Sequence, residues 1–367
     1  MVRAIDRKIP IIRGGVHSSL LPETTIESPY IDIIVKGEGE ETIIELAHVI
    51  KNNIPLANVR GIIYKENGKV EENPNRDFVD LNRYPPPAWH LIENNMASYQ
   101  VKIQTSRGCP YNCSFCYNQK FHQRKWRAKS PERVIEDINF LKQNYNIDGV
   151  MFYDDTFYVD KKRALKILEG IRLPAKTDIR IDLVDENLLA RMKEFGIFDI
   201  LIGVESGSDR ILKMLNKGIT VEDIKRVVRL LAKYNLRVGY SAIIGVPRES
   251  EAEKKETIGL LLWIHSVHKN KTITVGPYLP YPSSKLYEIA IEDGFVPPKD
   301  TKGWGMADRW SKEVRLPWVN DDGIYRIREY FKFFNYNVPF LDAIGELRLR
   351  HNWLEFPWDI NLIPQLS

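Results

Sequence analysis

Apolar and polar residues alternate in six short segments of the chain, a pattern that predicts β-strands. The segments are residues 101–106, 148–155, 178–183, 198–205, 237–245 and 272–279. Between them, apolar residues recur every three or four positions, which is the period of an amphipathic helix. Six successive strand–helix units imply a parallel sheet with right-handed crossovers. Because a closed barrel needs eight units, the pattern predicts an α/β fold with a partial (βα)6 barrel of the TIM type.

Local signals place the ends of several of these helices. Ser130 followed by Pro131 is typical of an N-cap and a first helical position. On the same reasoning, helices are expected to begin at Asp160, Asp185 and Thr220, and two of them to end at Gly170 and Gly196. Past residue 295 the chain becomes rich in aromatic residues, and one further helix is predicted there with a common apolar face. That face comprises Ile324, Ile327, Phe331 and Phe334, and five tryptophans lie in the same region: Trp304, Trp310, Trp318, Trp353 and Trp358.

The first hundred residues follow a different pattern. Residues 9–15 predict a strand and a turn, residues 31–52 a strand running into a helix, and residues 59–74 a hairpin. A proline-rich connector follows at residues 80–92. We therefore divide the chain into an N-terminal domain (1–79), a linker (80–97), the barrel (98–295) and a C-terminal aromatic-rich extension (296–367), which covers the open side of the barrel or lines a pocket.

Composition narrows the class of protein. The 367 residues are 43% apolar and 28% charged, with a net charge of +4, as in soluble globular proteins. No basic block stands out, so nucleic-acid binding is not expected. No apolar run is long enough for a membrane span, which needs about 18 residues, and the N-terminus does not resemble a signal peptide. These features, with unpaired cysteines, predict a cytoplasmic protein.

All three cysteines lie within eight positions, directly after the first predicted strand of the barrel. Cys109, Cys113 and Cys116 have the spacing C-x3-C-x2-C, and their odd number argues for ligands rather than disulfides. Three thiolates suit zinc or an iron–sulfur cluster. A structural zinc ion would need a fourth ligand, for which His122 is the nearest candidate. A cubane held by three cysteines would instead leave one iron open to an exogenous ligand.

This spacing, with Phe115 immediately before the third cysteine, resembles the signature of the radical S-adenosylmethionine (SAM) superfamily. The resemblance implies a [4Fe–4S] cluster on the three cysteines and SAM on the open iron. Reductive cleavage of SAM would then give a 5′-deoxyadenosyl radical. The resemblance also implies an electron donor such as flavodoxin or ferredoxin.

Further matches to the superfamily occur, in order, at the ends of later strands. The resemblance implies that Phe115, Asp154, Asp155, Glu205, Ser206, Ser241, Ile243 and Gly245 contact SAM. Asp154 and Asp155 replace the Gly-Gly-Glu stretch that holds the methionyl amino group in many members. Taken alone, these residues also fit an acidic strand end that faces solvent, and "ESGS" at 205–208 also fits a helix cap with a glycine turn. Arg180 and Asp182 are expected either in the mouth of the barrel or in an ion pair.

The N-terminal residues resemble part of a Rossmann-like cobalamin-binding domain, through "GGVHSSLLPE" and "VKGEGEET". The upstream D-x-H-x-x-G loop that supplies the cobalt-binding histidine in many members is not in the chain. We therefore expect a partial, truncated domain that binds cobalamin weakly or not at all. The whole chain resembles the cobalamin-linked subgroup, which includes anaerobic magnesium-protoporphyrin ester cyclases.

The resemblance implies hydrogen abstraction from an unactivated C–H bond. We slightly favour cobalamin-dependent methyl transfer, with cyclisation or oxidation as the alternative. Methylthiotransferase activity is disfavoured because the chain has no cysteines for an additional cluster. A non-catalytic zinc-binding interaction module is the rival from another class. No pattern identifies the substrate, which could be a small molecule, a lipid, a tetrapyrrole or a peptide.

Overall fold

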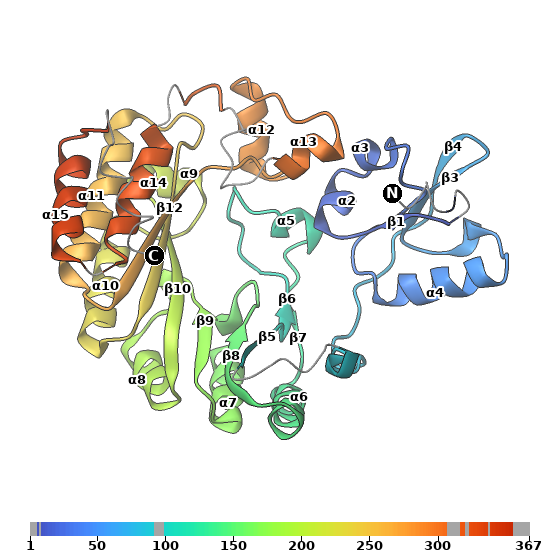
Figure 1. The fold of residues 1–367 in the computed structure, drawn as a ribbon, viewed down its shortest axis with the longest axis horizontal. Helices are drawn as coiled ribbons and strands as arrows, with labels where there is room; N and C mark the ends of the chain where they lie inside the picture. Colours follow the sequence, from blue (N-terminus) through green and yellow to red (C-terminus); the bar gives the residue numbers. More distant parts are fainter. Residues whose placement is uncertain are drawn as a thin grey trace. The chain divides into compact units, whose positions relative to one another are not determined.

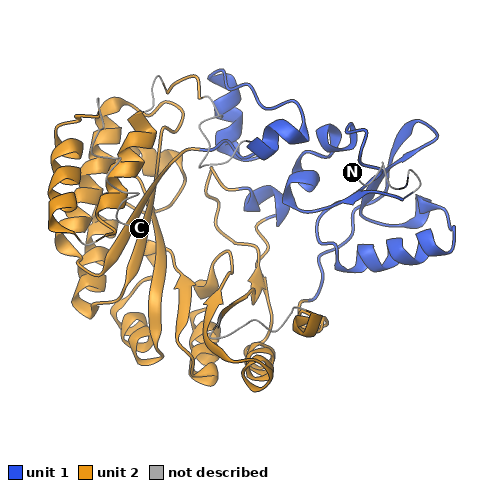
Figure 2. Cartoon of the chain, in the orientation of Figure 1, with its two compact units in different colours: residues 1–80, 117–123, 279–314 blue, residues 81–116, 124–278, 315–367 orange. Residues whose placement is uncertain are grey.

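A computed structural model describes residue 6 and residues 9–91, 99–306, 316–319, 323–336 and 338–354. The chain forms two compact units (Figure 2): unit 1 comprises Met1–Asp80, Tyr117–Gln123 and Leu279–Val314, and unit 2 comprises Leu81–Cys116, Arg124–Tyr278 and Arg315–Ser367. Each unit thus gathers segments that are distant in sequence. Trp310, Trp358 and residues 92–97 of the predicted linker lie outside the described residues.

A six-stranded parallel sheet forms the centre of unit 2, as the sequence predicts. Its strand order is β12-β11-β10-β9-β8-β5, so β5 and β12 are the two edges. The strands are β5 (Tyr99–Ile103), β8 (Ile147–Phe152), β9 (Ala175–Asp178), β10 (Ile197–Glu205), β11 (Val238–Ile244) and β12 (Lys271–Pro277). The fold is therefore the predicted partial (βα)6 barrel with parallel strands.

Five helices pack side by side in chain order along one face of this sheet (Figure 1). They are α6 (Pro131–Asn144), α7 (Lys161–Ile171), α8 (Glu186–Glu194), α10 (Val221–Tyr234) and α11 (Glu251–Val267), and the short α9 (Asp209–Met214) precedes α10. Ser130 caps α6 by accepting from the Arg133 amide, and Thr220 forms a capping box with Asp223 at α10. These two predicted helix starts are confirmed.

Strand residues alternate between the helix-covered face and a second face, which we call the inner face. On β10, Ile200, Ile202 and Val204 are fully buried in the core shared with the helices. Leu201 lies on the inner face and is 47% exposed. Gly203 is two positions after Leu201 and therefore on the same face. A Cβ at Gly203 would lie 2.1 Å from the Glu205 carboxylate, which places that carboxylate over the inner face.

Several predicted boundaries are wrong. The first two strands of the barrel end at Ile103 and Phe152 rather than at residues 106 and 155. Two further differences have a clear physical cause. The third strand was predicted at residues 178–183, but β9 ends at Asp178 and Ile181–Leu183 form a 3-10 turn. Ile179 and Ile181 are both buried, so they produce a strand-like alternation without strand pairing. Helix α7 continues past Gly170 to Ile171. The close packing of Ile135 explains Gly170, because a Cβ there would lie 2.4 Å from the Ile135 Cδ1 atom.

The C-terminal helices α14 (Gly323–Phe333) and α15 (Pro339–Arg350) complete unit 2. The predicted apolar face of residues 324–334 is confirmed, since its four members are all buried. Asn335 then pairs with the edge strand β12. Its side-chain amide donates to the Ile273 carbonyl at 3.0 Å and accepts from the Ile273 amide at 2.8 Å. These bonds satisfy backbone groups that an edge strand would otherwise leave open.

Unit 1 contains a four-stranded mixed sheet of order β1-β2-β3-β4. Strands β1 (Ile12–Arg13) and β2 (Ile33–Val35) are parallel, whereas β3 (Ile62–Glu66) and β4 (Lys69–Glu72) form the predicted hairpin, and α4 (Glu40–Lys51) packs on the sheet through Leu46. Asn67 and Gly68 turn the hairpin with positive φ angles of 50° and 76°. The unit also contains α2 (Val16–Leu20), α3 (Pro22–Ile26), α5 (Asn118–Phe121), α12 (Lys285–Glu292) and α13 (Thr301–Met306). In the described part of the chain, no helix combines the length and apolar character needed to cross a membrane.

Candidate functional site

The three cysteines lie on the loop that follows β5, at the carboxyl end of the parallel sheet. This is the edge at which barrels of this type hold their active sites. The Ser114 amide donates to the Leu215 carbonyl at 2.9 Å, and the Asn216 side chain donates to the Asn112 carbonyl at 2.6 Å. The middle of the cysteine loop is therefore fixed to the segment that follows α9.

Two consecutive aspartates after β8 hold the start of the cysteine loop. The buried Asp154 carboxylate accepts from the Thr105 amide and hydroxyl, each at 2.5 Å, and from the Ser106 amide at 2.9 Å. Asp155 accepts from the Gly108 amide at 2.8 Å. These bonds place both aspartates against the backbone just before Cys109. Burial raises the pKa of Asp154 even though its bonds with Thr105 and Ser106 oppose the shift.

Arg180 contacts the second cysteine from the neighbouring strand end. Its Nη1 atom lies 3.4 Å from the Cys113 Sγ atom, and its Nη2 atom donates to the Lys217 carbonyl at 2.6 Å. The guanidinium also forms an ion pair with Asp182, with Nε 2.9 Å from Oδ1, and lies 3.7 Å from the centre of the Tyr111 ring. Arg180 therefore both forms the expected ion pair and reaches a cysteine.

The donor set fits an iron–sulfur cluster. All three cysteines are free of disulfides, and Cys109 lies 3.4 Å from the Thr156 hydroxyl oxygen. Burial raises the pKa of the Cys109 thiol in the metal-free protein. Hydroxyl and guanidinium groups beside cysteine sulfurs are the surroundings that stabilise thiolate ligands. Cys109, Cys113 and Cys116 thus offer three soft sulfur ligands of the kind that such a cluster takes.

The zinc alternative depends on a fourth ligand, for which His122 is the candidate. Among the described residues, no three His, Cys, Asp or Glu side chains, the cysteines included, converge on one metal position, so this finding does not separate zinc from a cluster. His122 is buried, with its ring edge against Phe121 at a centroid distance of 4.7 Å and beside Phe78 at 6.1 Å. These contacts account for His122 as a packed aromatic residue of unit 1.

A buried ion pair lies at the end of β10. The Lys217 ammonium is 2.7 Å from the Glu205 carboxylate, and both side chains are about 92% buried. Glu205 has a positive φ of 62°, an uncommon conformation for a residue with a Cβ. The same ammonium lies 5.8 Å from the centre of the Phe115 ring. The predicted residues Glu205 and Phe115 are therefore brought together by a lysine that the motif did not indicate.

Asp178 ends β9 on the inner face. Burial, followed by the charge of Asp154, raises the pKa of Asp178 to about 7. Its buried Oδ1 atom has no hydrogen-bond partner among the described residues. A carboxyl group with these properties, on the face that also carries Glu205, could bind or exchange a proton with a polar ligand.

Ser206 and Gly207 pack against α11 in the middle of that helix. The fully buried Ser206 hydroxyl lies 3.0 Å from the Thr257 hydroxyl, and the Gly207 amide donates to the same Thr257 oxygen at 2.9 Å. The tight approach that Gly207 allows is therefore to a helix backbone. A contact between Ser206 and SAM stays a prediction.

The predicted residues of the fifth strand lie on β11 and just beyond it. Ser241 and Ile243 are half-buried at alternate positions, as inner-face residues are. Gly245 has a φ of 74°, and its amide donates to the Glu249 carboxylate at 2.5 Å. Burial raises the pKa of Glu249 to about 7. The roles of Ser241, Ile243 and Gly245 toward adenine stay predictions.

Comparison with known proteins agrees with this architecture. The radical SAM superfamily model matches residues 103–261. An uncharacterized methyltransferase of Pyrococcus horikoshii is 34% identical over 309 residues, covering 81% of this chain and 66% of that protein. The anaerobic magnesium-protoporphyrin IX monomethyl ester cyclase of Rubrivivax gelatinosus is 27% identical, covering 78% and 54%. This chain thus spans between half and two thirds of the length of these relatives.

Solved structures show the same fold. The radical SAM methyltransferase TsrM of Kitasatospora setae, with tryptophan and a SAM analogue bound, has a TM-score of 0.65 at 19% identity, covering 78% of this chain and 59% of that one. The cobalamin-dependent radical enzyme OxsB has a TM-score of 0.58 at 23% identity, covering 76% and 41%. The chain belongs to the radical SAM superfamily, a superfamily of enzymes that use a [4Fe–4S] cluster and SAM.

Several residues around the site could not be identified from motifs. Lys217, Thr156 and Tyr111 contact predicted residues but belong to no signature in the sequence. The sequence did not indicate that Lys217 pairs with Glu205. The two residues are twelve positions apart, and only the fold of the segment between them brings their side chains together. Arg180 was a candidate for the mouth of the barrel, but nothing local indicated its contact with Cys113, which is 67 positions away.

Proposed function

We propose that this chain contains the catalytic barrel of a radical SAM enzyme, with a [4Fe–4S] cluster held by Cys109, Cys113 and Cys116. The supporting observation is a cysteine loop at the carboxyl edge of the sheet whose backbone is bound by Asp154 and Asp155. Such a cluster, when bound, has an open iron and supplies the electron for reductive cleavage of SAM. A flavodoxin-like or ferredoxin-like protein is the class of electron donor that this chemistry needs.

The residues of the chain then have distinct tasks. Arg180 is positioned to donate to the sulfur of Cys113, which favours its thiolate form. The Thr156 hydroxyl oxygen lies 3.4 Å from the sulfur of Cys109. The inner face offers a polar end at Glu205 and Asp178, suited to the charged and hydroxyl groups of SAM. Apolar side chains such as Ile243 on the same face suit a planar base.

The cluster assignment is tested by anaerobic reconstitution of the purified chain. We expect about four irons and four sulfides per chain, as a cubane requires, and reductant-dependent cleavage of SAM. Each variant Cys109→Ala, Cys113→Ala and Cys116→Ala should lose the cluster absorbance and most of the iron. His122→Ala is the matched control and should retain both. Zinc as the only metal, lost in the His122 variant and without SAM cleavage, would instead establish the zinc-binding module.

For the reaction, we propose hydrogen abstraction from a C–H bond followed by methyl transfer. The name of the Pyrococcus relative favours methyl transfer, whereas the Rubrivivax cyclase supports ring formation as the second candidate. Methylation should consume a second SAM and release S-adenosylhomocysteine beside 5′-deoxyadenosine. Product formation with 5′-deoxyadenosine alone would favour the cyclase-like reaction.

Cobalamin would be the methyl carrier in this reaction; unit 1 offers one edge suited to a ligand, and we expect this chain to bind cobalamin weakly or not at all. Gly15 follows β1 and Gly37 follows β2, with positive φ angles of 97° and 68°, and no atom would lie within 4 Å of a Cβ at either. Parallel sheets bind ligands at the carboxyl ends of their strands. Gly15 and Gly37 lie at this edge, and both leave space there for a ligand. Equilibrium dialysis of the chain with hydroxocobalamin measures the affinity. Tight stoichiometric binding would contradict our expectation of weak binding and strengthen the methyltransferase assignment.

A further inference from the structure

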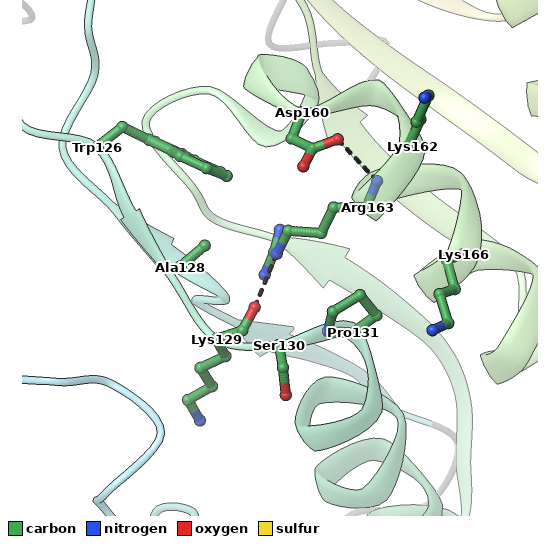
Figure 3. Close-up of a pocket in the computed structure, with 9 residues that line it drawn as sticks. All are labelled: Trp126, Ala128, Lys129, Ser130, Pro131, Asp160, Lys162, Arg163 and Lys166. Carbon is green, nitrogen blue, oxygen red and sulfur yellow. Dashed lines mark hydrogen bonds between the residues drawn. The ribbon is translucent and has the colours of Figure 1, made fainter.

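A cavity of about 440 Å³ lies in unit 2, apart from the cysteines and the inner face (Figure 3). It is bounded by β7 (Arg127–Ala128) with the preceding Trp126, by the start of α6 and by the first turns of α7. Arg163 of α7 reaches into it between Trp126 and the Lys129 backbone, as Figure 3 shows. No residue of the proposed SAM site lines this cavity.

Two residues that line this cavity each have a buried hydrogen-bond donor with no acceptor in the described part of the chain. The Arg163 guanidinium is fixed by Nε, which donates to the Lys129 carbonyl at 2.8 Å, and by Nη2, which donates to the Thr105 carbonyl at 3.0 Å. Arg163 is 93% buried, and its remaining nitrogen, Nη1, is unpartnered. The indole Nε1 atom of Trp126 is also buried without a partner. Because folded proteins satisfy nearly all buried polar groups, both donors indicate a missing acceptor.

The charges at the cavity favour an anionic acceptor. Its lining contains four cationic side chains and a single carboxylate, that of Asp160. Asp160 already accepts from the Arg163 amide as the N-cap of α7. Lys129 and Lys166 pair with acids outside the lining, whereas Lys162 forms no ion pair with any described residue. The N-termini of both α6 and α7 border the cavity and add positive potential.

We propose that this cavity binds a phosphate group, either as free phosphate or as the phosphate monoester of a small molecule. A phosphate offers several acceptor oxygens and no obligatory donor, which matches a guanidinium nitrogen, an indole N–H and a nearby ammonium. The volume is within the range of small-ligand sites. Lys162 and Arg163 supply the charge, and Trp126 supplies a directional hydrogen bond.

A chain of hydrogen bonds connects the cavity with the start of the cysteine loop. Arg163 donates to the carbonyl of Thr105, and the amide and hydroxyl of Thr105 donate to Asp154. A bound phosphate would fix the guanidinium and, through it, the start of the loop that carries Cys109. Phosphate should therefore slow the loss of iron from the reconstituted protein as well as bind to the protein.

The test is isothermal titration of the full chain, reconstituted and metal-free, with inorganic phosphate and in parallel with phenyl phosphate. We expect saturable binding at one site per chain. Trp126→Phe keeps an aromatic ring but removes the N–H, and Lys162→Met removes the ammonium; each should weaken binding several-fold. Arg163→Met should weaken binding by about tenfold or more. Arg226→Met is the charge-matched control, because Arg226 is exposed on α10 and should leave affinity unchanged.

The two ligands separate the two sources of phosphate. Tighter binding of phenyl phosphate assigns the site to an organic monoester, and equal or weaker binding assigns it to free phosphate. Absence of binding by either ligand in the millimolar range would overturn the proposal. Equal phosphate affinity of the wild type, Trp126→Phe and Lys162→Met would also overturn it, because phosphate would then bind elsewhere. This outcome can be read even if Arg163→Met fails to fold.

Discussion

Replacement of Gly207 by alanine tests the packing that holds the end of β10 in place. A Cβ at Gly207 would lie 2.3 Å from the Glu256 carbonyl oxygen and 2.7 Å from the Thr257 Cα atom. Both are backbone atoms within α11, so no side-chain rotation can relieve the contact. The φ of Gly207 lies outside the left-handed region, so space and not backbone conformation is the constraint.

The size of the expected destabilisation follows from the separation of the turn and α11 that the new methyl group would require. Relief of this contact requires the turn and α11 to separate, which would stretch the bonds that Thr257 makes with Gly207 and Ser206 at 2.9 and 3.0 Å. Overpacking of a close-packed site costs about 1–3 kcal/mol, and each lost hydrogen bond costs about 1 kcal/mol. We expect Gly207→Ala to lower the free energy of unfolding by about 3–5 kcal/mol.

Urea unfolding followed by far-UV circular dichroism measures this difference. Gly259→Ala is the matched control, because Gly259 lies on the same helix and a Cβ there would meet no atom within 4 Å. In a helix interior this change should stabilise the protein by about 0.5–1 kcal/mol. If the Gly207 variant unfolds within error of the wild type while the Gly259 variant gains stability, the proposed close packing of the turn on α11 is wrong.

Two further substitutions examine the acidic residues of the site. Asp154→Asn should lower the free energy of unfolding by about 2–3 kcal/mol, since one amide oxygen cannot serve the three donors of Thr105 and Ser106. The variant should also retain less iron after reconstitution. Unchanged iron content would argue against a role of Asp154 in holding the loop. Asp178→Asn should remove a pH dependence of the free energy of unfolding. The pKa of the wild-type carboxyl is about 7 in the folded state and about 3.9 in the unfolded state. Between these two pH values the carboxyl is protonated in the folded state and ionised in the unfolded state. Wild-type stability should therefore fall by about 2–4 kcal/mol as pH rises from 4 to 8, and parallel pH profiles for wild type and variant in urea unfolding would contradict this assignment.

Short-range patterns in the sequence were sufficient for much of the fold. Cap residues such as Ser130 and Thr220 act within one helical turn, so their effect could be read directly, and Asn67-Gly68 specified its hairpin for the same reason. The strand near residue 178 was misplaced because Ile179 and Ile181 are buried alternately without pairing as a strand. Gly170 was read as a helix end because the packing of Ile135 against it is not visible in local sequence.

The site was predictable only where chemistry is concentrated in sequence. Three cysteines within eight positions indicate a shared ligand set without knowledge of the fold, whereas Lys217 and Arg180 acquire their roles through contacts between different strand ends. Asp154 illustrates the difference. Its place after the second strand was expected to matter for SAM, but the sequence could not show that its carboxylate is occupied by the backbone of residues 105 and 106.

The contacts of Asp154 and Asp155 also suggest why an acidic pair can replace glycines at this position. A carboxylate that accepts from several backbone amides is strongly held, because charge-assisted hydrogen bonds are stronger than neutral ones. Asp155 binds the Gly108 amide, one residue before Cys109, while Asp154 binds two residues of the preceding turn. The second strand end therefore fixes the orientation of the first cysteine, and Arg180 from the third strand end reaches the second. Because the ends of the adjacent strands β8 and β9 supply these contacts, the surroundings of Cys109 and Cys113 are fixed in the metal-free chain.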